Sequence, residues 1–435
     1  MHAAVETGAL AKRVRVPECL VGGRLGKLAL MAAFWMAVFV TAYARTIEIN
    51  NVVKLKLAID DARSGDELVL LDGEYLLDGT HGIDCKTSGT PGAPIVVRAA
   101  NPHGARIVSR AVEAFNVSAP YWQFKALAIQ GVCADDSICE HAFHVVGPAS
   151  GFRMEGNHIV DFNAPLKVNA DVQHNMPNDG VVEGNLISAT HPRDTASPVA
   201  FINIDNGSGW IVRRNTIADF HKLRGDRTSF GAFAKGGANT PVFEQNLVLC
   251  TKADRGGGSR IGLSLGGGGM DAALCAPHWD ASVPCDPETS YGLIRNNVIA
   301  NCSDVGIYLN RARATAVLHN TLVGTAGIDF RFSSTGEAHG NVLTAQIRRR
   351  DGGNFSGRDN LEDVPMAKLR ASFAEPLFGR MQIRGDLQWL ARQANPNEQV
   401  KTDYCNRDRG EGNLDMGALQ VSLGECVASA PPPSP

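Results

Sequence analysis

Short segments in which apolar and polar residues alternate recur along much of the chain. One segment places Ile202 and Ile204 on the same face of a strand, and another does so with Ala232 and Ala234. Because side chains of a β-strand point alternately to opposite faces, each segment has one apolar face and one polar face. The segments lack the 3.6-residue period of an amphipathic helix. The pattern therefore predicts many short strands that bury one face in a common core.

An asparagine returns about once per repeat, just before a short apolar strand. The seven positions are Asn157, Asn185, Asn215, Asn246, Asn297, Asn320 and Asn341. Their intervals of 28, 30, 31, 51, 23 and 21 residues indicate a stacked repeat of short strands, a β-solenoid. We therefore expect an all-β fold, a single-stranded right-handed parallel β-helix. Asparagine tolerates left-handed backbone, and stacked copies about 4.8 Å apart can bond to one another, so we interpret these residues as a structural ladder at the corners.

The repeat sets the expected domain boundaries. We predict an N-terminal extension and signal peptide over residues 1–44, the β-helix domain over residues 45–425, and a proline-rich tail over residues 426–435. Within the domain, the regular coils are expected from about residue 142 to residue 361. Before them, residues 51–64 have the apolar spacing of a short helix, which would cap the open first coil. Further strands are predicted at residues 67–71, 94–99 and 122–130.

The N-terminus has the features of an export signal. Arg24 and Lys27 precede an apolar run over residues 28–40, and residues 42–44 form a small-x-small cleavage site before Arg45. The alternative is a single membrane anchor, for which the run is short. We expect a secreted or periplasmic protein with no stable membrane span after cleavage.

The cysteine content agrees with an oxidising compartment. Of ten cysteines, Cys19 lies in the segment expected to be removed, which leaves nine and therefore one free thiol. Local pairs consistent with the spacing are Cys133 with Cys139, Cys275 with Cys285, and Cys405 with Cys426. Cys250 and Cys302 follow their coil asparagines by four and five residues and could be stacked neighbours, but the sequence leaves the connectivity open. The spacing of Cys and His residues does not indicate a zinc site.

Composition and charge narrow the class of partner. The net charge is −3, which indicates neither nucleic acid binding nor strong electrostatic attraction to another charged partner. The 46 glycines and 6% aromatic residues fit a chain with many tight turns. We expect a monomer that acts on a polysaccharide.

The polar face of the strands carries the candidate site, which we call the polar strip. Aligning the strands gives one outward row of Asn203, Phe233, Ser264, Tyr308 and Asp329, and a second row of Asp205, Lys235, Gly266, Asn310 and Arg331. The preceding coils add Lys167, Asn169 and His144. An insertion over residues 266–290 borders the strip. Such a dense row of cations, amides and acids suits an extended, anionic or hydroxyl-rich polymer, although a solvated sheet face would also be polar. The predicted substrate-binding residues are His144, Lys167, Asn203, Asp205, Ser264, Asn310, Asp329 and Arg331.

Three segments resemble a known family. Residues 58–75, with Gly65-Asp66, are similar to the N-terminal helix, Gly-Asp and strand of secreted right-handed parallel β-helix proteins, especially polysaccharide lyases of the chondroitinase B and alginate lyase kind. Residues 89–99 match the second element of that pattern, and residues 415–420 resemble the Asp-x-Gly-Ala ending of such proteins. The resemblance implies the β-helix fold and a lyase activity on uronate-containing polysaccharide.

The resemblance also suggests site residues. In these lyases a strand lysine precedes an asparagine-bearing turn, and Lys235 in a Lys-Gly-Gly-Ala-Asn segment occupies that position. An arginine is expected about one coil later, and Arg260 is the nearest by spacing, with Arg255 as the alternative. The family binds calcium through two glutamates shortly before the lysine, but Thr228 and Phe230 stand there. Calcium is therefore the cofactor that the resemblance suggests, without the acidic ligands that it would need.

For a lyase, β-elimination from a uronate assigns three roles. Lys235 would remove the proton next to the carboxylate, provided that neighbouring cations or burial favour its neutral form. Arg260 or Arg331 would neutralise the carboxylate by bidentate contact, and Tyr308 would protonate the leaving oxygen. The alternative for Lys235 is a purely structural role, in a surface ion pair with Asp205.

Two other functions stay open. A glycoside hydrolase needs two carboxylates about 5–10 Å apart, whereas Asp205 and Asp329 are expected several coils apart. A non-catalytic glycan-binding or cell-surface β-helix protein is the alternative outside enzymes.

Overall fold

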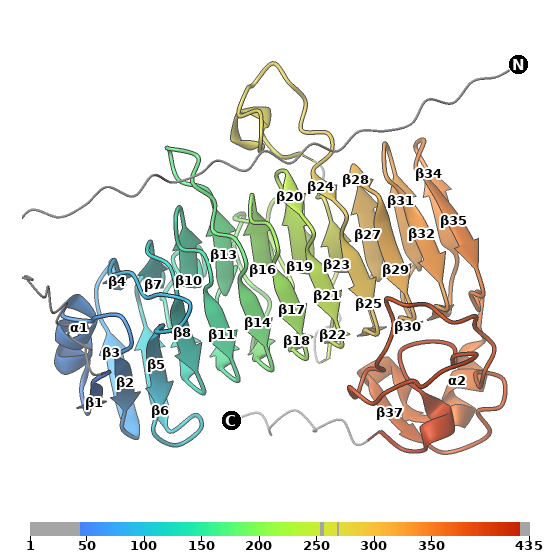
Figure 1. Cartoon of the computed structure of the whole chain (residues 1–435), viewed down its shortest axis with the longest axis horizontal. Coiled ribbons are helices and arrows are strands. Elements are labelled where there is room, and N and C mark those ends of the chain that lie inside the picture. The colour runs from blue at the N-terminus through green and yellow to red at the C-terminus, as the bar shows by residue number, and fades with distance from the viewer. Residues whose placement is uncertain (1–43, 253–255, 268, 427–435) are drawn as a thin grey trace, which may run out of the picture. The chain divides into compact units, whose positions relative to one another are not determined.

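The computed structural model describes residues 44–252, 256–267 and 269–426. Three parallel sheets run along this part of the chain (Figure 1). Each complete coil contributes one strand to each sheet, and β1 and β35 add one strand at either end of the 12-stranded sheet alone. The 12-stranded sheet contains β1 (Thr46–Ile49), β2 (Glu67–Leu70), β5 (Ile95–Ala99), β8 (Trp122–Lys125), β11 (Arg153–Glu155), β14 (Val181–Glu183), β17 (Ile211–Arg213), β21 (Val242–Glu244), β25 (Leu293–Arg295), β29 (Thr315–Leu318), β32 (Thr335–His339) and β35 (Asn354–Arg358).

The other two long sheets have ten strands each in the described residues. The sheet that carries the polar strip contains β4 (Ile83–Cys85), β7 (Glu113–Val117), β10 (His141–Val146), β13 (Leu166–Asn169), β16 (Val199–Asp205), β19 (Thr228–Lys235), β23 (Ser259–Leu265), β27 (Ile307–Asn310), β31 (Ile328–Arg331) and β34 (Ile347–Arg350). The third sheet contains β3 (Gly73–Leu77), β6 (Ala105–Ser109), β9 (Ala128–Gly131), β12 (His158–Val160), β15 (Leu186–Ser188), β18 (Thr216–Ala218), β22 (Leu247–Leu249), β26 (Val298–Ala300), β30 (Thr321–Val323) and β33 (Val342–Leu343).

The core lies between the three sheets and is formed by the inward side chains. Ile202, Ile204, Ala232 and Ala234 are all fully buried, as the alternation predicts. The predicted right-handed parallel β-helix is thus confirmed. Its regular coils begin earlier than the predicted residue 142, because β1 already pairs in parallel with β2.

The single strand predicted over residues 122–130 is wrong. The chain turns a corner there and forms β8 and β9, which belong to different sheets. Ala126 adopts a left-handed backbone with φ 55°, and the backbone N–H of Leu127 donates to Asn157 Oδ1 at 3.0 Å. A continuous apolar pattern conceals this bend because both strands bury residues in the same core.

The asparagine ladder is confirmed in detail. Asn215 is typical: its Oδ1 accepts from the backbone N–H of Asn185 at 3.0 Å, and its Nδ2 donates to Asn246 Oδ1 at 3.0 Å. Asn360, which the repeat analysis did not include, extends the ladder by accepting from the Asn341 side chain at 3.0 Å. The left-handed residue at each corner is the one before the asparagine, for example Arg214 with φ 56°. The ladder therefore relies on the hydrogen bonds of asparagine rather than on its backbone tolerance.

Helix α1 (Val52–Asp60) caps the first coil, within the predicted residues 51–64. Asn51 is its N-cap, and the Asn51 side chain accepts from the backbone N–H of Lys54 at 2.9 Å. Leu55 and Ile59 are buried in the core of the β-helix. The helix covers apolar side chains that the open end of a solenoid would otherwise expose.

The last coil ends at β35, close to the predicted end of the regular coils at residue 361. Residues 359–426 add no further coil within the described residues, although the predicted β-helix domain extends to residue 425. This C-terminal segment packs beside the last coils (Figure 1). It contains α2 (Met366–Ser372), β36 (Phe373–Glu375), η2 (Pro376–Phe378), β37 (Arg380–Ile383) and η3 (Val421–Leu423). Leu369 and Phe373 of the segment pack with Leu247 and Val298, which point outward from the third sheet, in a second hydrophobic core.

Four disulfides have the predicted partners: Cys133 with Cys139, Cys250 with Cys302, Cys275 with Cys285, and Cys405 with Cys426. Cys85 is the free, buried cysteine of the described residues. No helix in the described part of the chain is both long and apolar enough to cross a membrane. Residues 1–43, with the predicted signal peptide, and most of the proline-rich tail, residues 427–435, lie outside the described residues.

Candidate active site on one face of the β-helix

The predicted register of the polar strip is confirmed. Asn203 pairs with Phe233, Phe233 with Ser264, Ser264 with Tyr308, and Tyr308 with Asp329 on successive parallel strands. In the second row Asp205 pairs with Lys235, and Asn310 with Arg331. Lys167 pairs with Asn203 and with His144, so the strip continues toward the N-terminal coils.

A carboxylate joins two lysines at one end of the strip. Lys167 Nζ donates to Asp205 Oδ2 and, at 3.2 Å, to Asn203 Oδ1. Lys235 Nζ lies 3.8 Å from Asp205 Oδ1 and 4.8 Å from the centre of the Phe233 ring. The lysine side chains are each 20% exposed and Asp205 is 9% exposed. The cluster carries a net positive charge of one on a surface that is partly open to solvent.

Tyr308 forms the second cluster of the strip. Its hydroxyl accepts from Asn310 Nδ2 at 3.0 Å and from Arg331 Nη1 at 3.3 Å. Arg331 Nε also donates to Asp351 Oδ2 at 2.5 Å. Arg331 is therefore held in place by two partners, and its position fixes the Tyr308 hydroxyl.

Between the two clusters the strip consists of small residues. The Ser264 side chain is fully buried and its hydroxyl donates to the Gly266 carbonyl. Gly266 has φ 69°, and a Cβ there would lie 1.8 Å from the carbonyl oxygen of Asn310. Only glycine fits this position. Ser264 and Gly266 are both buried, so the part of the strip between Lys235 and Tyr308 is not open to solvent.

Asp329 is in register but is not available to a ligand. It is 1% exposed, and its two oxygens accept from Arg348 Nε at 2.6 Å and Arg350 Nη1 at 2.9 Å. Asp205 lies four strands away from Asp329, which is about 19 Å at the usual strand spacing. This separation exceeds the distance that glycoside hydrolysis requires between its two carboxylates.

Arg260 does not join Lys235. Arg260 pairs with Ser229 at the start of β19, whereas Lys235 ends that strand. Six residues of strand separate them, about 20 Å. Arg260 is 4% exposed and its Nη1 donates to the Gly256 carbonyl at 2.9 Å. The spacing correctly predicted that Arg260 lies one coil after Lys235, but it could not predict that Arg260 lies at the opposite end of the strand. The alternative, Arg255, lies outside the described residues.

His144 lies at the N-terminal end of the strip in a fixed network. Its Nδ1 is 2.7 Å from Glu113 Oε1 and its Nε2 is 2.7 Å from Asn169 Oδ1. Burial opposes ionisation of Glu113, but the hydrogen bond to His144 lowers the pKa of that carboxyl. Burial, together with the charge of His144, lowers the pKa of the neighbouring His141 to about 4. His144 thus has both ring nitrogens occupied, which suits a positioning role.

Glu288 is a buried acid beside the strip that the sequence patterns did not reveal. It is fully buried just before β24 (Thr289–Ser290), accepts from the backbone N–H of Gly267 at 2.7 Å, and lies 3.5 Å from Arg311 Nη1. A Cβ on Gly267 would lie 3.2 Å from Lys235 Cδ and 4.0 Å from Glu288 Oε2. Glu288 thus anchors the insertion where it touches Lys235. It lies in an insertion without periodicity, so no repeat pattern could place it.

The residues do not fit the calcium site that the resemblance suggests. Thr228 and Phe230 supply no carboxylate, and the Thr228 hydroxyl donates to the Asp226 carbonyl at 3.4 Å. Within residues 44–252, 256–267 and 269–426, no group of three or more His, Cys, Asp or Glu side chains is arranged to hold a metal ion. The carboxylates of the strip, Asp205 and Asp329, are instead occupied by lysines and arginines.

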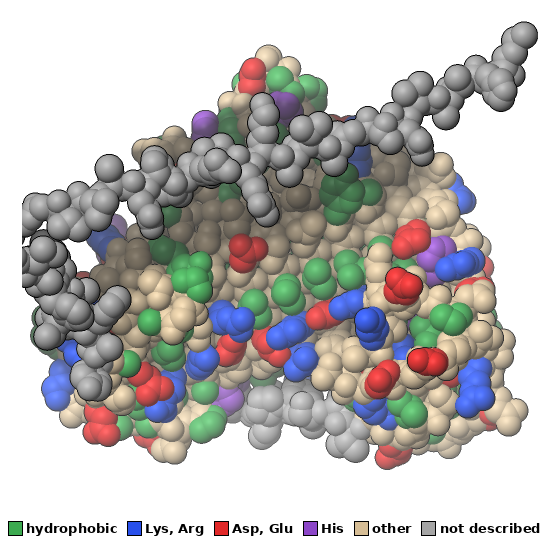
Figure 2. Space-filling view, viewed as in Figure 1, with side chains coloured by type: hydrophobic (Ala, Val, Ile, Leu, Met, Phe, Trp, Pro, Cys, Tyr) green, Lys and Arg blue, Asp and Glu red, His purple; other side chains and the backbone are tan. Residues whose placement is uncertain are grey.

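The 12-stranded sheet has a different surface. Figure 2 shows a band of alternating basic and acidic side chains on this face. Arg213 Nη2 lies 2.7 Å from Glu183 Oε2, and Arg295 Nη2 lies 2.6 Å from Glu244 Oε2. These charges neutralise one another across neighbouring coils. The charges of this band pair with one another, whereas the lysine cluster of the strip keeps a net charge.

Comparison with known proteins supports the fold. No family model and no curated protein matches the chain. Among solved structures, pectate lyase Pel9A is similar with a TM-score of 0.57 at 16% identity, over 84% of this chain and 90% of that chain. A rhamnogalacturonan lyase has a TM-score of 0.50 at 14% identity, over 85% and 92% of the two chains. The predicted resemblance to β-helix polysaccharide lyases is therefore confirmed at the level of the fold.

Proposed function

We propose that this protein is a polysaccharide lyase that cleaves a uronate-containing polymer by β-elimination along the polar strip. The observation that carries the proposal is the lysine cluster formed by Lys167, Asp205 and Lys235, which lies on the same sheet as Tyr308, two strands from Lys235. Solved structures of the same fold include lyases named for pectate and rhamnogalacturonan. Their names make acidic plant polysaccharides the first substrates to test.

The proposed chemistry assigns a role to each of three residues of the strip. Lys235 in its neutral form takes the C5 proton of the uronate, the electrons of that bond form the C4–C5 double bond, and the C4–O4 bond breaks. Lys167, in place of the distant Arg260, neutralises the uronate carboxylate, which makes the C5 proton more acidic. Tyr308, two strands or about 10 Å from Lys235, donates the proton to the leaving oxygen.

A non-catalytic glycan-binding protein is the second candidate. The contact between Lys235 and Asp205 favours it, because a lysine in an ion pair is less available to accept a proton from a substrate. The same strip would then bind an anionic polymer without cleaving it.

The decisive experiment is incubation with polygalacturonate, rhamnogalacturonan, alginate and chondroitin sulfate while ultraviolet absorbance is recorded. Elimination creates an unsaturated uronate that absorbs, whereas hydrolysis does not. We expect absorbance to rise with at least one polymer, and Lys235→Ala to lower the rate about 10²–10⁴-fold.

The matched control is Lys125→Ala. Lys125 lies on the 12-stranded sheet and pairs with Glu155 at 3.0 Å, so this variant removes an ion-paired lysine outside the strip. It should keep the parent rate. Cleavage at the parent rate by folded Lys235→Ala would exclude the proposed base, and polymer binding without any product would favour the non-catalytic candidate.

We also propose that the protein acts outside the cytoplasm, as a monomer. The four disulfides support an oxidising compartment. N-terminal sequencing of the exported protein should give Arg45 as the first residue. A first residue before Arg45 would contradict the proposed cleavage.

A further inference from the structure

Two loops rise from the edge of the sheet next to the lysine cluster. Residues 170–179 follow β13, and the insertion over residues 266–290 follows β23, and both project from the same edge (Figure 1). Asn206, directly after Asp205, joins their bases. Its Oδ1 accepts from the backbone N–H of Ala170 at 3.4 Å, and its Nδ2 donates to the carbonyl of Leu274 at 2.7 Å. Asn206 is 3% exposed, so this junction is internal.

The two loops also meet away from their bases. The rings of His174 and Trp279 are stacked with their centroids 4.4 Å apart and their planes 5° from parallel. His174 is exposed and Trp279 is half-buried. The Trp279 backbone has φ 52°, which is uncommon for a bulky residue. Such a conformation persists only where the surrounding structure holds it in place.

The insertion that carries Trp279 is well anchored. The disulfide between Cys275 and Cys285 closes it, and the backbone N–H of Ala276 donates to the Gly236 carbonyl at 3.0 Å. Gly236 directly follows Lys235. The insertion that carries Trp279 is therefore attached directly to the residue that follows the proposed base.

We propose that His174 and Trp279 form a subsite that binds a sugar ring of the polymer by stacking. This inference rests on the proposed function of the strip. Stacking covers one face of each ring. The outer face of the exposed His174 ring can pack on the C–H groups of a sugar, while its nitrogens bond to sugar hydroxyls and Trp279 supports the ring from behind. Because both rings are already ordered, binding there costs little side-chain entropy.

The test measures affinity separately from turnover. Binding of polygalacturonate, rhamnogalacturonan, alginate and chondroitin sulfate is measured by calorimetry on Lys235→Ala protein, with and without Trp279→Ala. We expect Trp279→Ala to raise the Kd of a bound polymer about 2–10-fold, the usual contribution of one aromatic contact. Trp279→Phe, which keeps a stacking ring, should stay within about 2-fold of the parent. In the otherwise unmodified protein, Trp279→Ala should raise KM and leave kcat nearly unchanged.

Trp389→Ala is the matched control, because Trp389 is half-buried in the C-terminal segment against Lys368, 4.4 Å from the ring centre. It should not change the Kd. An unchanged Kd in folded Trp279→Ala protein, or no binding of any of the four polymers, would overturn the subsite. If Lys235→Ala still yields unsaturated product, the proposed base fails, whereas a raised Kd in Trp279→Ala would still support the subsite.

Discussion

Lys235 Nζ lies 3.8 Å from Asp205 Oδ1, and that oxygen accepts no hydrogen bond from the residues that the structure describes. The other oxygen of Asp205 accepts directly from Lys167. One carboxylate thus serves two lysines unequally, and Lys235 is the more loosely held. This asymmetry leaves Lys235 the freer of the two to turn toward a substrate.

Asp205→Asn tests how the carboxylate controls the two lysines. Removing the negative charge leaves two ammonium groups side by side, so the neutral amine of Lys235 becomes easier to form. We expect the acidic limb of the pH profile of kcat/KM to move to lower pH. Measuring this profile on purified variant and parent protein checks the expectation.

Asp329→Asn is the control for this shift. Within the described residues Asp329 forms ion pairs with Arg348 and Arg350, and arginine stays protonated at any working pH. Its substitution should leave the position of the profile unchanged. A folded Asp205→Asn protein with an unshifted profile would show that Lys235 does not act as a base beside Asp205.

The sequence predicted the fold and the register because both depend on local repetition. Alternation separates the inward Ile204 from the outward Asp205, and the coil asparagines supply the offset between strands. The neighbours of the site depend on segments without repetition. Arg348 reaches Asp329 from the last coil, and Trp279 meets His174 across two loops whose paths have no period.

Asn215→Ala is expected to destabilise the whole coil stack. Its side chain is 1% exposed, and removing it leaves the Asn185 N–H and the Val182 carbonyl, bonded at 3.0 and 2.9 Å, without their partner. Buried unsatisfied groups cost about 1–3 kcal/mol each, so the two should lower the free energy of unfolding by about 2–6 kcal/mol. Denaturant titration followed by circular dichroism measures the loss.

Asn360→Ala removes a rung at the end of the same ladder and serves as the comparison. Asn360 is only half-buried, so water can replace part of its bonding, and the expected loss is about 1 kcal/mol. Equal losses at both positions would show that burial does not set the strength of the ladder.

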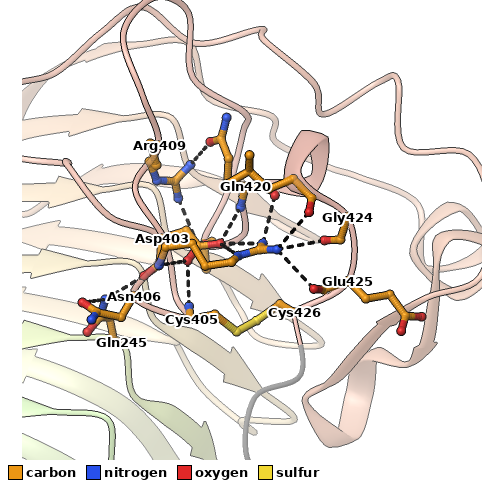
Figure 3. The surroundings of a disulfide bond; sticks show 12 residues. Gln245, Asp403, Cys405, Asn406, Arg409, Gln420, Gly424, Glu425 and Cys426 are labelled. Atoms are coloured by element: carbon orange, nitrogen blue, oxygen red, sulfur yellow. Dashed lines mark hydrogen bonds and ion pairs between the residues drawn. A yellow bond between two sulfur atoms is a disulfide. The ribbon is translucent and has the colours of Figure 1, made fainter.

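The disulfide between Cys405 and Cys426 should hold the C-terminal segment in place. Figure 3 shows Asp403 and the carbonyl groups of Gly424 and Glu425 around it. Arg407 connects them, with Nη2 2.7 Å from Asp403 Oδ2 and Nη1 3.1 Å from the Gly424 carbonyl. The disulfide joins cysteines that are 21 residues apart in sequence. For a loop of this length the chain-entropy model gives about 3 kcal/mol of stabilisation.

Replacing both cysteines by serine should therefore expose the C-terminal segment while the coils stay folded. Limited proteolysis with mass spectrometry should find new cleavage between residues 405 and 426. The variant with serines at Cys275 and Cys285 should not show this cleavage, since that disulfide belongs to the insertion. Protection of residues 405–426 equal to the parent would show that the side-chain bonds of Arg407 suffice.

Stability in acid should depend on His319. This side chain is 1% exposed beneath the C-terminal segment, and its Nδ1 lies 3.1 Å from the Asp415 carbonyl. Burial, followed by the charge of Arg409, lowers the pKa of His319 to about 3. The unfolded chain, with an ordinary histidine pKa near 6.5, thus binds one more proton than the folded chain between pH 6.5 and about 3.

The contribution of His319 is therefore complete above pH 6.5 and is lost as the pH falls below that value, by up to about 1.4 kcal/mol per pH unit. His319→Asn cannot take up the proton, and its Nδ2 can still donate to the Asp415 carbonyl. We expect the variant to lose stability less steeply than the parent between pH 6.5 and 4, measured by urea titrations at several pH values. His81→Asn, at an exposed position, should follow the parent curve. Parallel curves for His319→Asn and the parent would mean that the buried ring becomes protonated without unfolding, and that its burial does not cause the acid sensitivity.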